Sequence, residues 1–273
     1  MIKKLDHFDI SKIAMSGQCF RIHQDGNGIW TAVADDKVLL IHEIENDGKG
    51  RSTCDFDCSD SEFDAFWTPY FDLDTDYEAF CRLVDPDDEY LNAAVDYGRG
   101  IRILKQDLWE VTISFIISQR KSIPSISSCI EKISSLYGPE ITDGIHAFPS
   151  PDVMAMVSED ELRSCALGYR APYIHKTSQL ILESINSGED FIQTAATLSD
   201  EEVIDRLKQL PGVGIKVSNC ISLFGLHRLA AFPRDTWILR IEDKYYGGHF
   251  PEEKYPGCAG LMQQYMFFYE KRK

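Results

Sequence analysis

The sequence predicts an α+β protein that is mainly helical and has a small antiparallel β-containing domain at its N-terminus. Residues 29–44 alternate between apolar and polar side chains around an Asp-Asp pair, which is typical of two strands joined by a turn. From about residue 101 onward, apolar residues recur at helical spacing. We therefore expect a β-rich domain at 1–100 and a helical domain at 101–273.

The elements expected along the chain follow from local patterns. Residues 57–80 are acidic and aromatic and predict a mixture of loop and short helix. Helices are expected, in order, at 108–119, 121–138, 171–188 and 198–210, with a further one ending near Leu226. The first of these is apolar on most faces and should be buried. The fourth opens with Ser199 and Glu202 at capping-box spacing.

Composition limits the class of protein and its location. No run of about 18 apolar residues is present, so a membrane-spanning helix is not expected. The first residues lack the apolar core of a signal peptide. Eight cysteines at irregular spacing predict reduced thiols in a cytoplasm of the bacterial type, where the protein would lie near the nucleoid. Cys54 and Cys58 form a lone C-x3-C without a second pair, so a metal site is not expected there.

The charge of the chain is unevenly distributed. A net charge of −16 would by itself argue against nucleic-acid binding. Residues 35–100 hold 19 acidic and 5 basic side chains, whereas residues 201–273 are slightly basic. The overall charge therefore does not exclude a DNA-binding face, but it predicts weak non-specific binding that depends strongly on salt. We interpret the acidic segment as a solvated surface.

The stretch LPGVGIKVSNC, residues 210–220, predicts a helix–hairpin–helix with its hairpin at about 207–217. Gly212, Val213 and Gly214 would form the turn, with backbone N–H groups at the start of the second helix. Such a turn suits one DNA phosphate without side-chain charge. A plain glycine turn between two packed helices explains the same residues equally well.

A lysine and an aspartate follow this turn at positions that suit chemistry. Lys216 lies where the second helix begins, and Asp235 lies at the start of the next helix. The amine could attack a sugar C1′ carbon, while the carboxylate stabilises the positive charge that develops there. Asp235 could equally be a simple helix N-cap.

These features resemble the helix–hairpin–helix (HhH-GPD) DNA glycosylase superfamily, and specifically its 8-oxoguanine DNA glycosylase branch. Six motifs occur in the family's order: SGQCF (16–20), LKQDLWEVTISFIISQ (104–119), LGYRAPYI (167–174), LPGVGIKVSNC (210–220), PRD (233–235) and AGLMQQYMF (259–267). The resemblance implies a helical glycosylase body and an enzyme that flips the damaged nucleotide out of duplex DNA. It also implies a lyase step after base removal.

The resemblance implies a role for each matching residue. Lys216 would be the nucleophile that forms a Schiff base, and Asp235 the assisting carboxylate. Cys220 and Phe267 would contact the two faces of the base, because a thiol and an aromatic ring suit a flat heterocycle. Gln263 would contact its Watson–Crick edge, since an amide offers both donor and acceptor.

Gly17 would provide the discrimination between 8-oxoguanine and guanine. The lesion carries an N7–H where guanine has a bare acceptor, so a backbone carbonyl at this glycine would accept from the lesion only. One such contact contributes on the order of 1–3 kcal/mol. Tyr169 would be the wedge that fills the vacated stack, and Arg170 would read the opposite base.

The chain departs from the family pattern at three positions. Arg120 replaces the gap-filling asparagine, Ser125 replaces a second cytosine-reading arginine, and Trp237 replaces a histidine. Arg120 could still fill the gap as a stacking plane. We therefore expect a looser requirement for cytosine opposite the lesion.

Two alternative functions would need fewer of these residues. A monofunctional alkylbase (3-methyladenine-type) glycosylase would not need Lys216, and a non-enzymatic helix–hairpin–helix module would need neither Lys216 nor Asp235. An iron–sulfur cluster is not expected, because only Cys258 lies beyond residue 220. No organic cofactor is implied. The resemblance implies a monovalent cation at the hairpin carbonyls of Lys208, Leu210 and Val213. The expected partner is duplex DNA containing oxidised guanine, not a membrane, and the protein is expected to be a monomer.

Overall fold

A computed structural model describes residues 1–272 and shows two compact units. Unit 1 comprises 1–32, 39–105 and 227–273, and unit 2 comprises 33–38 and 106–226. The two sequence segments expected at 1–100 and 101–273 differ from these units, because the C-terminal residues group with the N-terminal ones. Among residues 1–272, no helix has the length and apolar character that crossing a membrane requires.

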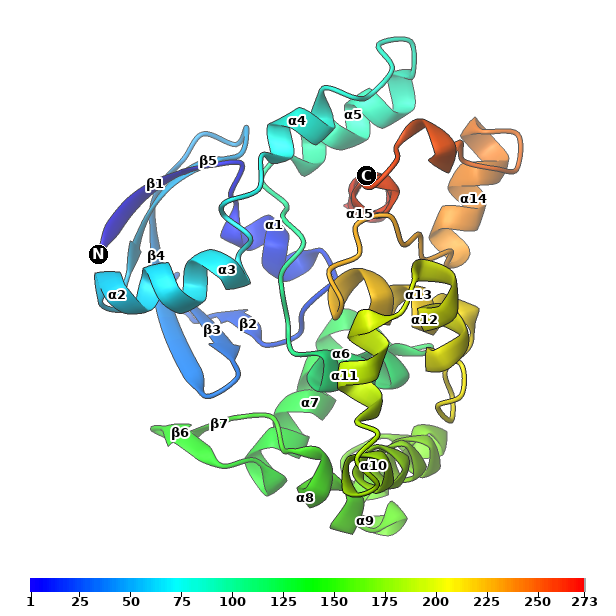
Figure 1. The fold of residues 1–273 in the computed structure, drawn as a ribbon. Coiled ribbons are helices and arrows are strands. Elements are labelled where there is room, and N and C mark those ends of the chain that lie inside the picture. The colour runs from blue at the N-terminus through cyan, green and yellow to red at the C-terminus, as the bar shows by residue number, and fades with distance from the viewer. Residues whose placement is uncertain (273) are drawn as a thin grey trace. The chain divides into compact units, whose positions relative to one another are not determined.

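The N-terminal sheet has five strands in the order β1-β5-β4-β3-β2 (Figure 1). Their bounds are β1 Ile2–Asp6, β2 Ile22–Gln24, β3 Trp30–Ala34, β4 Lys37–Asn46 and β5 Arg51–Phe56. The pairs β1–β5, β4–β5 and β2–β3 are antiparallel. The expected strand pair around Asp35 and Asp36 is confirmed as β3 and β4, and Asp35 adopts a φ of +51° in the turn.

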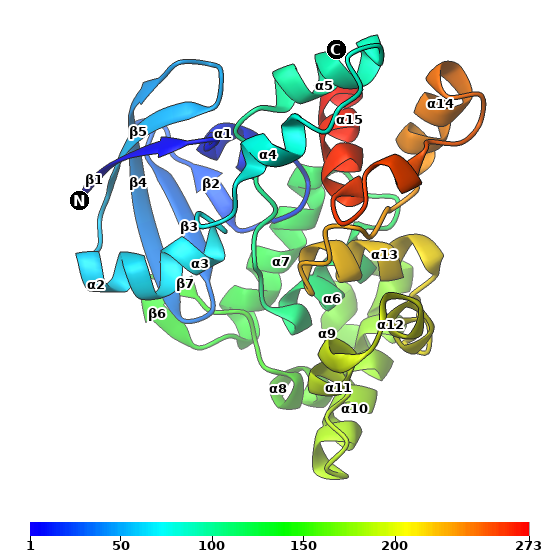
Figure 2. The same ribbon diagram turned by 45° about the horizontal axis from the view of Figure 1, so that its top comes forward.

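Short helices make up most of the rest of unit 1. They are α1 Ile10–Met15, α2 Asp60–Glu62, the π-helix η1 Phe63–Trp67, α3 Thr68–Tyr70, α4 Tyr77–Cys81, α5 Glu89–Gly98, α14 Thr236–Tyr245, the 3-10 helix η3 Glu252–Lys254 and α15 Ala259–Arg272. Helices α5 and α15 lie side by side (Figure 2). A Cβ added at Gly98 would lie 2.5 Å from Cδ1 of Tyr265, so glycine permits this close packing.

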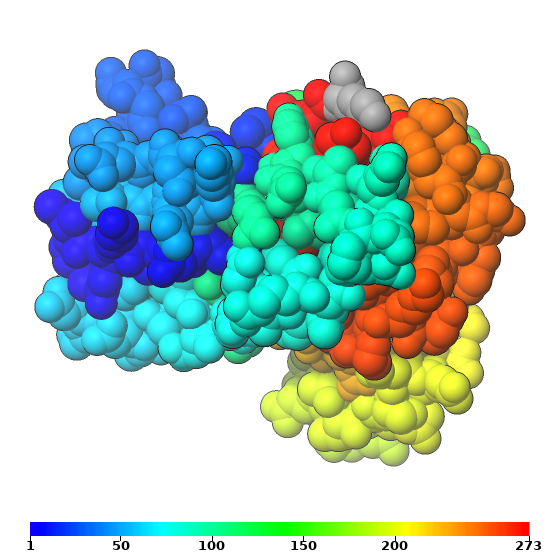
Figure 3. Space-filling model, turned by 90° about the horizontal axis from the view of Figure 1, so that it is seen from above, coloured from blue at the N-terminus to red at the C-terminus, as the bar shows by residue number. Residues whose placement is uncertain are grey.

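The C-terminal segment is part of the surface that unit 1 presents. Seen from above, the red and orange residues of α14 and α15 adjoin the teal residues of α4 and α5 (Figure 3). Residues that are far apart in the sequence thus share one face. Helix α15 places its buried side chains on nearly every side, from Ala259 to Phe268, which explains why it lacks a polar face.

Unit 2 is mainly helical, and besides the strand ends in 33–38 it contains one short strand pair. Its elements are α6 Leu108–Ser118, α7 Ile123–Tyr137, β6 Glu140–Thr142, β7 Ile145–His146, α8 Pro151–Met156, α9 Glu159–Ser164, the 3-10 helix η2 Gly168–Arg170, α10 Ala171–Asn186, α11 Phe191–Thr197, α12 Asp200–Leu207 and α13 Ile215–Phe224. The buried helix expected near 108–119 is confirmed as α6. The capping box of Ser199 and Glu202 is also confirmed, with both reciprocal bonds present. The mainly helical α+β class is therefore confirmed.

Candidate active site

The turn between α12 and α13 has the geometry of a glycine hairpin. Gly212 has a φ of +80°, and a Cβ there would lie 2.7 Å from the ring of Tyr173. Glycine is therefore required at this position both by backbone conformation and by space. Gly214 is the N-cap of α13 and provides no side-chain cap. Because the first N–H groups of a helix lack intrahelical acceptors, this end of α13 can receive an anion.

Lys216 is the second residue of α13 and rests against an aromatic side chain of α6. Its Nζ lies 5.5 Å from the ring centroid of Phe115, which stacks on Phe224 with 5.3 Å between centroids. Cys220 follows one turn later and is buried. Residues four apart on a helix share a face, so Lys216 and Cys220 project from the same side of α13.

Asp235 is the N-cap of α14. Its Oδ1 accepts hydrogen bonds from the backbone N–H groups of Trp237 and Ile238, both at 2.9 Å. These bonds hold the carboxylate at the positive end of the helix and do not use Oδ2. The predicted N-cap is therefore confirmed, and one carboxylate oxygen remains for another partner.

The backbone at Gly17 is held from both sides. Its φ is +81°, a conformation that favours glycine. The carbonyl of Ser16 accepts a 2.6 Å hydrogen bond from Nε2 of Gln264 on α15. The buried side chain of Gln18 donates to the carbonyl of Arg102 at 2.8 Å and accepts from the N–H of Leu104 at 2.8 Å. Gly17 therefore lies between two anchored residues.

Gln263 and Phe267 lie one turn apart on α15, on the same face. Gln263 is 4% exposed, and within residues 1–272 its Oε1 makes no hydrogen bond. A buried acceptor without a donor costs about 1–3 kcal/mol, so this atom is suited to a ligand that brings an N–H group. Phe267 is half-buried and has Nζ of Lys271 at 5.1 Å from its ring centroid.

The predicted wedge region lies on η2 and on the turn after α6. Tyr169 is 48% exposed, and the guanidinium of Arg170 lies 4.3 Å from its ring centroid. Arg170 itself is buried, with only 6% exposed, and donates to the carbonyl of Gln119. Arg120 is exposed with a φ of +53°.

The predicted residues are divided between the two units. Unit 2 holds Arg120, Tyr169, Arg170, Gly212, Val213, Gly214, Lys216 and Cys220, and unit 1 holds Gly17, Asp235, Gln263 and Phe267. Two contributing residues were missed, Gln18 and Gln264. Gln264 could have been identified from the sequence, because it is a second polar residue beside Gln263 in an otherwise apolar stretch.

Two family models match consecutive parts of the chain. Residues 113–254 match the model of the HhH-GPD superfamily base excision DNA repair protein, and residues 1–112 match the 8-oxoguanine DNA glycosylase, N-terminal domain. The chain belongs to the HhH-GPD superfamily. The superfamily fold that the sequence motifs predicted for this HhH-GPD protein is therefore confirmed.

Individual relatives agree with this placement. A probable N-glycosylase/DNA lyase of Methanothermobacter thermautotrophicus is 32% identical over 74% of this chain and 73% of its own length. The N-glycosylase/DNA lyase OGG1 of Arabidopsis thaliana is 36% identical over 54% of this chain, but over only 41% of its own length. A structure of Clostridium acetobutylicum 8-oxoguanine glycosylase/lyase with DNA covers 100% of this chain and 98% of its own, with 32% identity and a TM-score of 0.88.

The carbonyls expected to hold a cation in this HhH-GPD protein belong to the turn before α13. Lys208 is the C-cap of α12, where helix carbonyls lack intrahelical donors. The Leu210 carbonyl accepts from the N–H of Val213 at 3.1 Å and keeps a second lone pair. Oxygen ligands of this kind suit a hard cation, so the residues fit the expectation.

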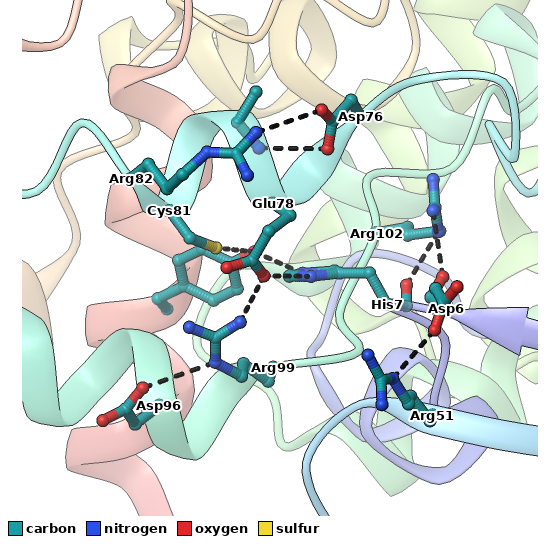
Figure 4. A network of polar contacts seen from close by, with 12 residues as sticks. Asp6, His7, Arg51, Asp76, Glu78, Cys81, Arg82, Asp96, Arg99 and Arg102 are labelled. Carbon is teal, nitrogen blue, oxygen red and sulfur yellow. Dashed lines mark hydrogen bonds and ion pairs between the residues drawn. The ribbon is translucent and has the colours of Figure 1, made fainter.

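Unit 1 of the HhH-GPD protein also contains a polar cluster whose side chains are of types that can bind a metal ion (Figure 4). One donor atom from each of His7, Glu78 and Cys81 lies within 4.8 Å of the others. Burial and the charges of Arg102 and Arg99 lower the pKa of His7 to about 3, and burial raises the pKa of Cys81 to about 11. A positive field and a thiol that resists ionisation both disfavour a metal cation.

The same cluster has a structural role. Nε2 of His7 lies 2.9 Å from the hydroxyl of Tyr265 on α15. Arg102 donates to the carbonyls of His7 at 2.8 Å and Asp6 at 3.2 Å (Figure 4), and to that of Asp72 at 2.5 Å. These bonds join the N-terminal strand, the segment before α4 and the C-terminal helix inside unit 1.

Proposed function

We propose that this protein is a bifunctional base-excision repair enzyme that removes 8-oxoguanine from duplex DNA and then cleaves the strand at the abasic site. The observation that carries the proposal is the position of Lys216 at the start of α13, directly after the glycine hairpin. Relatives named N-glycosylase/DNA lyase and a neighbour named 8-oxoguanine glycosylase/lyase support it.

Each step of the reaction has a group to perform it. The hairpin N–H groups bind a phosphate, and the lesion nucleotide is flipped out of the stack. The amine of Lys216 attacks C1′ as the bond from C1′ to N9 breaks, and the base leaves with the electron pair and takes up a proton. The Oδ2 atom of Asp235 stabilises the positive charge on the sugar.

Strand cleavage follows from the same covalent bond. The attack leaves an aminal in which the Lys216 nitrogen and O4′ are both bonded to C1′. The bond from C1′ to O4′ then breaks, O4′ takes up a proton, and an imine joins Lys216 to C1′. A C2′ proton is lost, the bond from C3′ to oxygen breaks, and the 3′ phosphate leaves with the electron pair. The imine accepts electrons from C2′, so no further cofactor is required for this step.

We assign recognition of the lesion to Gly17, Gln263, Cys220 and Phe267. The carbonyl at Gly17 accepts from the N7–H of 8-oxoguanine, and the unpartnered Oε1 of Gln263 accepts from an N–H of the base edge. Cys220 and Phe267 each offer a polarisable surface to the flat ring. The proposed partner is duplex DNA with oxidised guanine, bound by a monomer in the cytoplasm, with a monovalent cation at the hairpin and no other cofactor.

Borohydride trapping tests the proposal. Wild-type protein and Lys216→Gln are incubated with a duplex carrying one 8-oxoguanine, with undamaged and alkylated duplexes alongside. We expect a covalent complex on the lesion duplex only, and its complete loss in the variant. Release of alkylated bases that survives the substitution, with no trapped complex, would instead place the protein among monofunctional alkylbase glycosylases.

A further inference from the structure

Helix α15 carries a lysine one turn beyond the two residues that we assign to the base. Gln263, Phe267 and Lys271 follow one another at intervals of four residues, so they lie along one side of the helix. The Nζ atom of Lys271 lies 5.1 Å from the ring centroid of Phe267. This side of α15 therefore presents an amide, an aromatic ring and an ammonium in turn, and the reaction proposed for Lys216 and Asp235 leaves the ammonium without a role.

The ammonium of Lys271 has a positive charge that is not paired. With residues 1–272 it makes no ion pair and no hydrogen bond. Although the side chain is exposed as a whole, partial burial of the ammonium lowers the pKa of Lys271, the charge of Arg272 lowers it further, and the Asp235 carboxylate raises it. An ammonium that has lost part of its water and has no direct partner is stabilised by an incoming anion.

Lys271 borders the carboxylate of the candidate site as well as its aromatic ring. Helix α14, which Asp235 caps, packs against α15 inside unit 1 (Figure 1). The electrostatic effect of Asp235 on Lys271 agrees with this arrangement. In the proposed reaction Asp235 faces C1′ of the flipped nucleotide and Phe267 contacts its base, so the ammonium lies beside both parts of that nucleotide.

We propose that Lys271 binds one of the two phosphates that flank the flipped nucleotide. This inference rests on the proposed function, which places the base on Phe267 and the sugar at Asp235. The sugar that carries the base on C1′ also carries the phosphates on O3′ and O5′, so a cation beside C1′ and the base is close to a phosphate. Lysine binds phosphate as a point charge, and its flexible stem allows the ammonium to leave the ring of Phe267 for the phosphate. The cation–π contact that is lost is weak at an exposed site.

A neighbouring residue provides a matched control, because basic residues at the end of a helix also have a structural role. Lys271 and Arg272 both lie in the last turn of α15, where positive charge stabilises a helix. The guanidinium of Arg272 lies 5.7 Å from the ring centroid of Phe268, which is buried and has no part in the candidate site. Arg272 therefore resembles Lys271 in charge, helix position and ring contact, but it projects in another direction.

Equilibrium binding of a duplex that carries one 8-oxoguanine measures the contact. Every protein in this assay also carries Lys216→Gln, so that the lesion is bound but not excised. We expect Lys271→Met to weaken binding about eightfold at 0.1 M salt and to reduce the slope of log K against log salt by about 0.9, as the loss of one phosphate contact requires. Lys271→Arg should keep the affinity and the slope, and Arg272→Met should leave both near those of the parent.

Neutral phosphates identify the partner of Lys271. A methylphosphonate replaces first the phosphate 5′ to the lesion and then the phosphate 3′ to it. At one of these two positions, the replacement should weaken binding by the parent protein about eightfold and binding by Lys271→Met less than about twofold, because the variant has already lost the contact.

The outcomes separate this inference from the proposed function. A slope that Lys271→Met leaves unchanged, a loss of affinity equal to that of Arg272→Met, or the absence of coupling to either methylphosphonate overturns the inference and makes Lys271 a helix-end charge only. Wild-type protein that forms no covalent complex with the lesion duplex and excises no 8-oxoguanine overturns the proposed function instead. Thermal melting of each variant shows that it is folded at the temperature of the binding assay.

Discussion

At the residue scale, Gly17 shows how buried glutamines can shape a recognition backbone. The positive φ of Gly17 directs its main chain. Gln264 donates to the carbonyl that precedes it, and Gln18, the residue that follows, is held by hydrogen bonds to the backbone of Arg102 and Leu104. Gln18 is fully buried, so its amide is committed to these bonds. The discrimination proposed for Gly17 therefore depends on side chains that would not themselves contact the base.

Substituting alanine at Gly17 separates backbone strain from recognition. Gly28 has a φ of +86° and no close backbone neighbour, so Gly28→Ala imposes similar strain elsewhere. We expect each variant to lose about 1–2 kcal/mol of unfolding free energy in urea. Only Gly17→Ala should reduce the ratio of excision rates for 8-oxoguanine over guanine. Equal selectivity in both variants would show that the Gly17 carbonyl does not read the lesion.

At the scale of elements, the start of α14 combines a structural and a chemical role in one carboxylate. Oδ1 of Asp235 caps the helix, and the proposed chemistry uses Oδ2. Asparagine caps a helix about as well as aspartate, whereas alanine does not. Substituting asparagine and alanine at Asp235 therefore separates helix capping from the proposed chemistry.

Asp235→Asn should keep stability and lose activity. We expect its melting temperature to stay near that of the wild type, while the single-turnover rate of base release falls on the order of a hundredfold or more. Asp235→Ala should lose the same activity and also about 1 kcal/mol of stability. If Asp235→Asn excises the lesion at the wild-type rate, the carboxylate acts only as a cap.

The elements that the sequence predicted well are those whose signals are local. Helix α6 is apolar on most faces, and α12 opens with a capping box, so neighbouring residues alone define both. The π-helix η1 and the short helices beside it carry no such signal. Their aromatic residues contact distant parts of the chain, since Phe71 packs edge to face on Phe8 and Nζ of Lys3 lies 5.0 Å from the ring centroid of Phe63, so tertiary contacts contribute to their conformation.

At the scale of the whole molecule, the grouping of segments could not be predicted from the sequence. The C-terminal residues join unit 1 through α15, whose contacts with α5 and with the carbonyl of Ser16 connect positions more than 150 residues apart. Motifs identified the candidate residues. Gln18, Gln264 and Arg102, by contrast, hold the backbone in place through side-chain hydrogen bonds to carbonyls that are distant in the sequence. Such residues leave no pattern along the chain, because their partners are not neighbours in the sequence.

Asp72 is another long-range support, and it makes the stability of the protein depend on pH. It is buried, and its carboxylate accepts from Lys105 at 2.7 Å, from the Tyr77 hydroxyl at 2.9 Å and from His227 at 3.2 Å. Burial alone would raise its pKa, but the bonds from His227 and Lys105 outweigh burial and hold the pKa of Asp72 well below its usual range. His227 begins the C-terminal segment of unit 1.

A carboxyl group whose pKa is depressed by folding stabilises the protein above its unfolded-state pKa of about 4 and progressively less below it. Asp72→Asn should therefore lower the unfolding free energy at pH 7 by at least about 2 kcal/mol, since hydrogen bonds to a buried charge are lost. The difference from wild type should shrink as the pH falls below about 4, where the unfolded chain already takes up the proton. Urea unfolding between pH 7 and pH 3 measures this, with Asp36→Asn at the exposed β3–β4 turn as the control. A difference that stays constant over this range would mean that the side chain contributes through its shape rather than its charge.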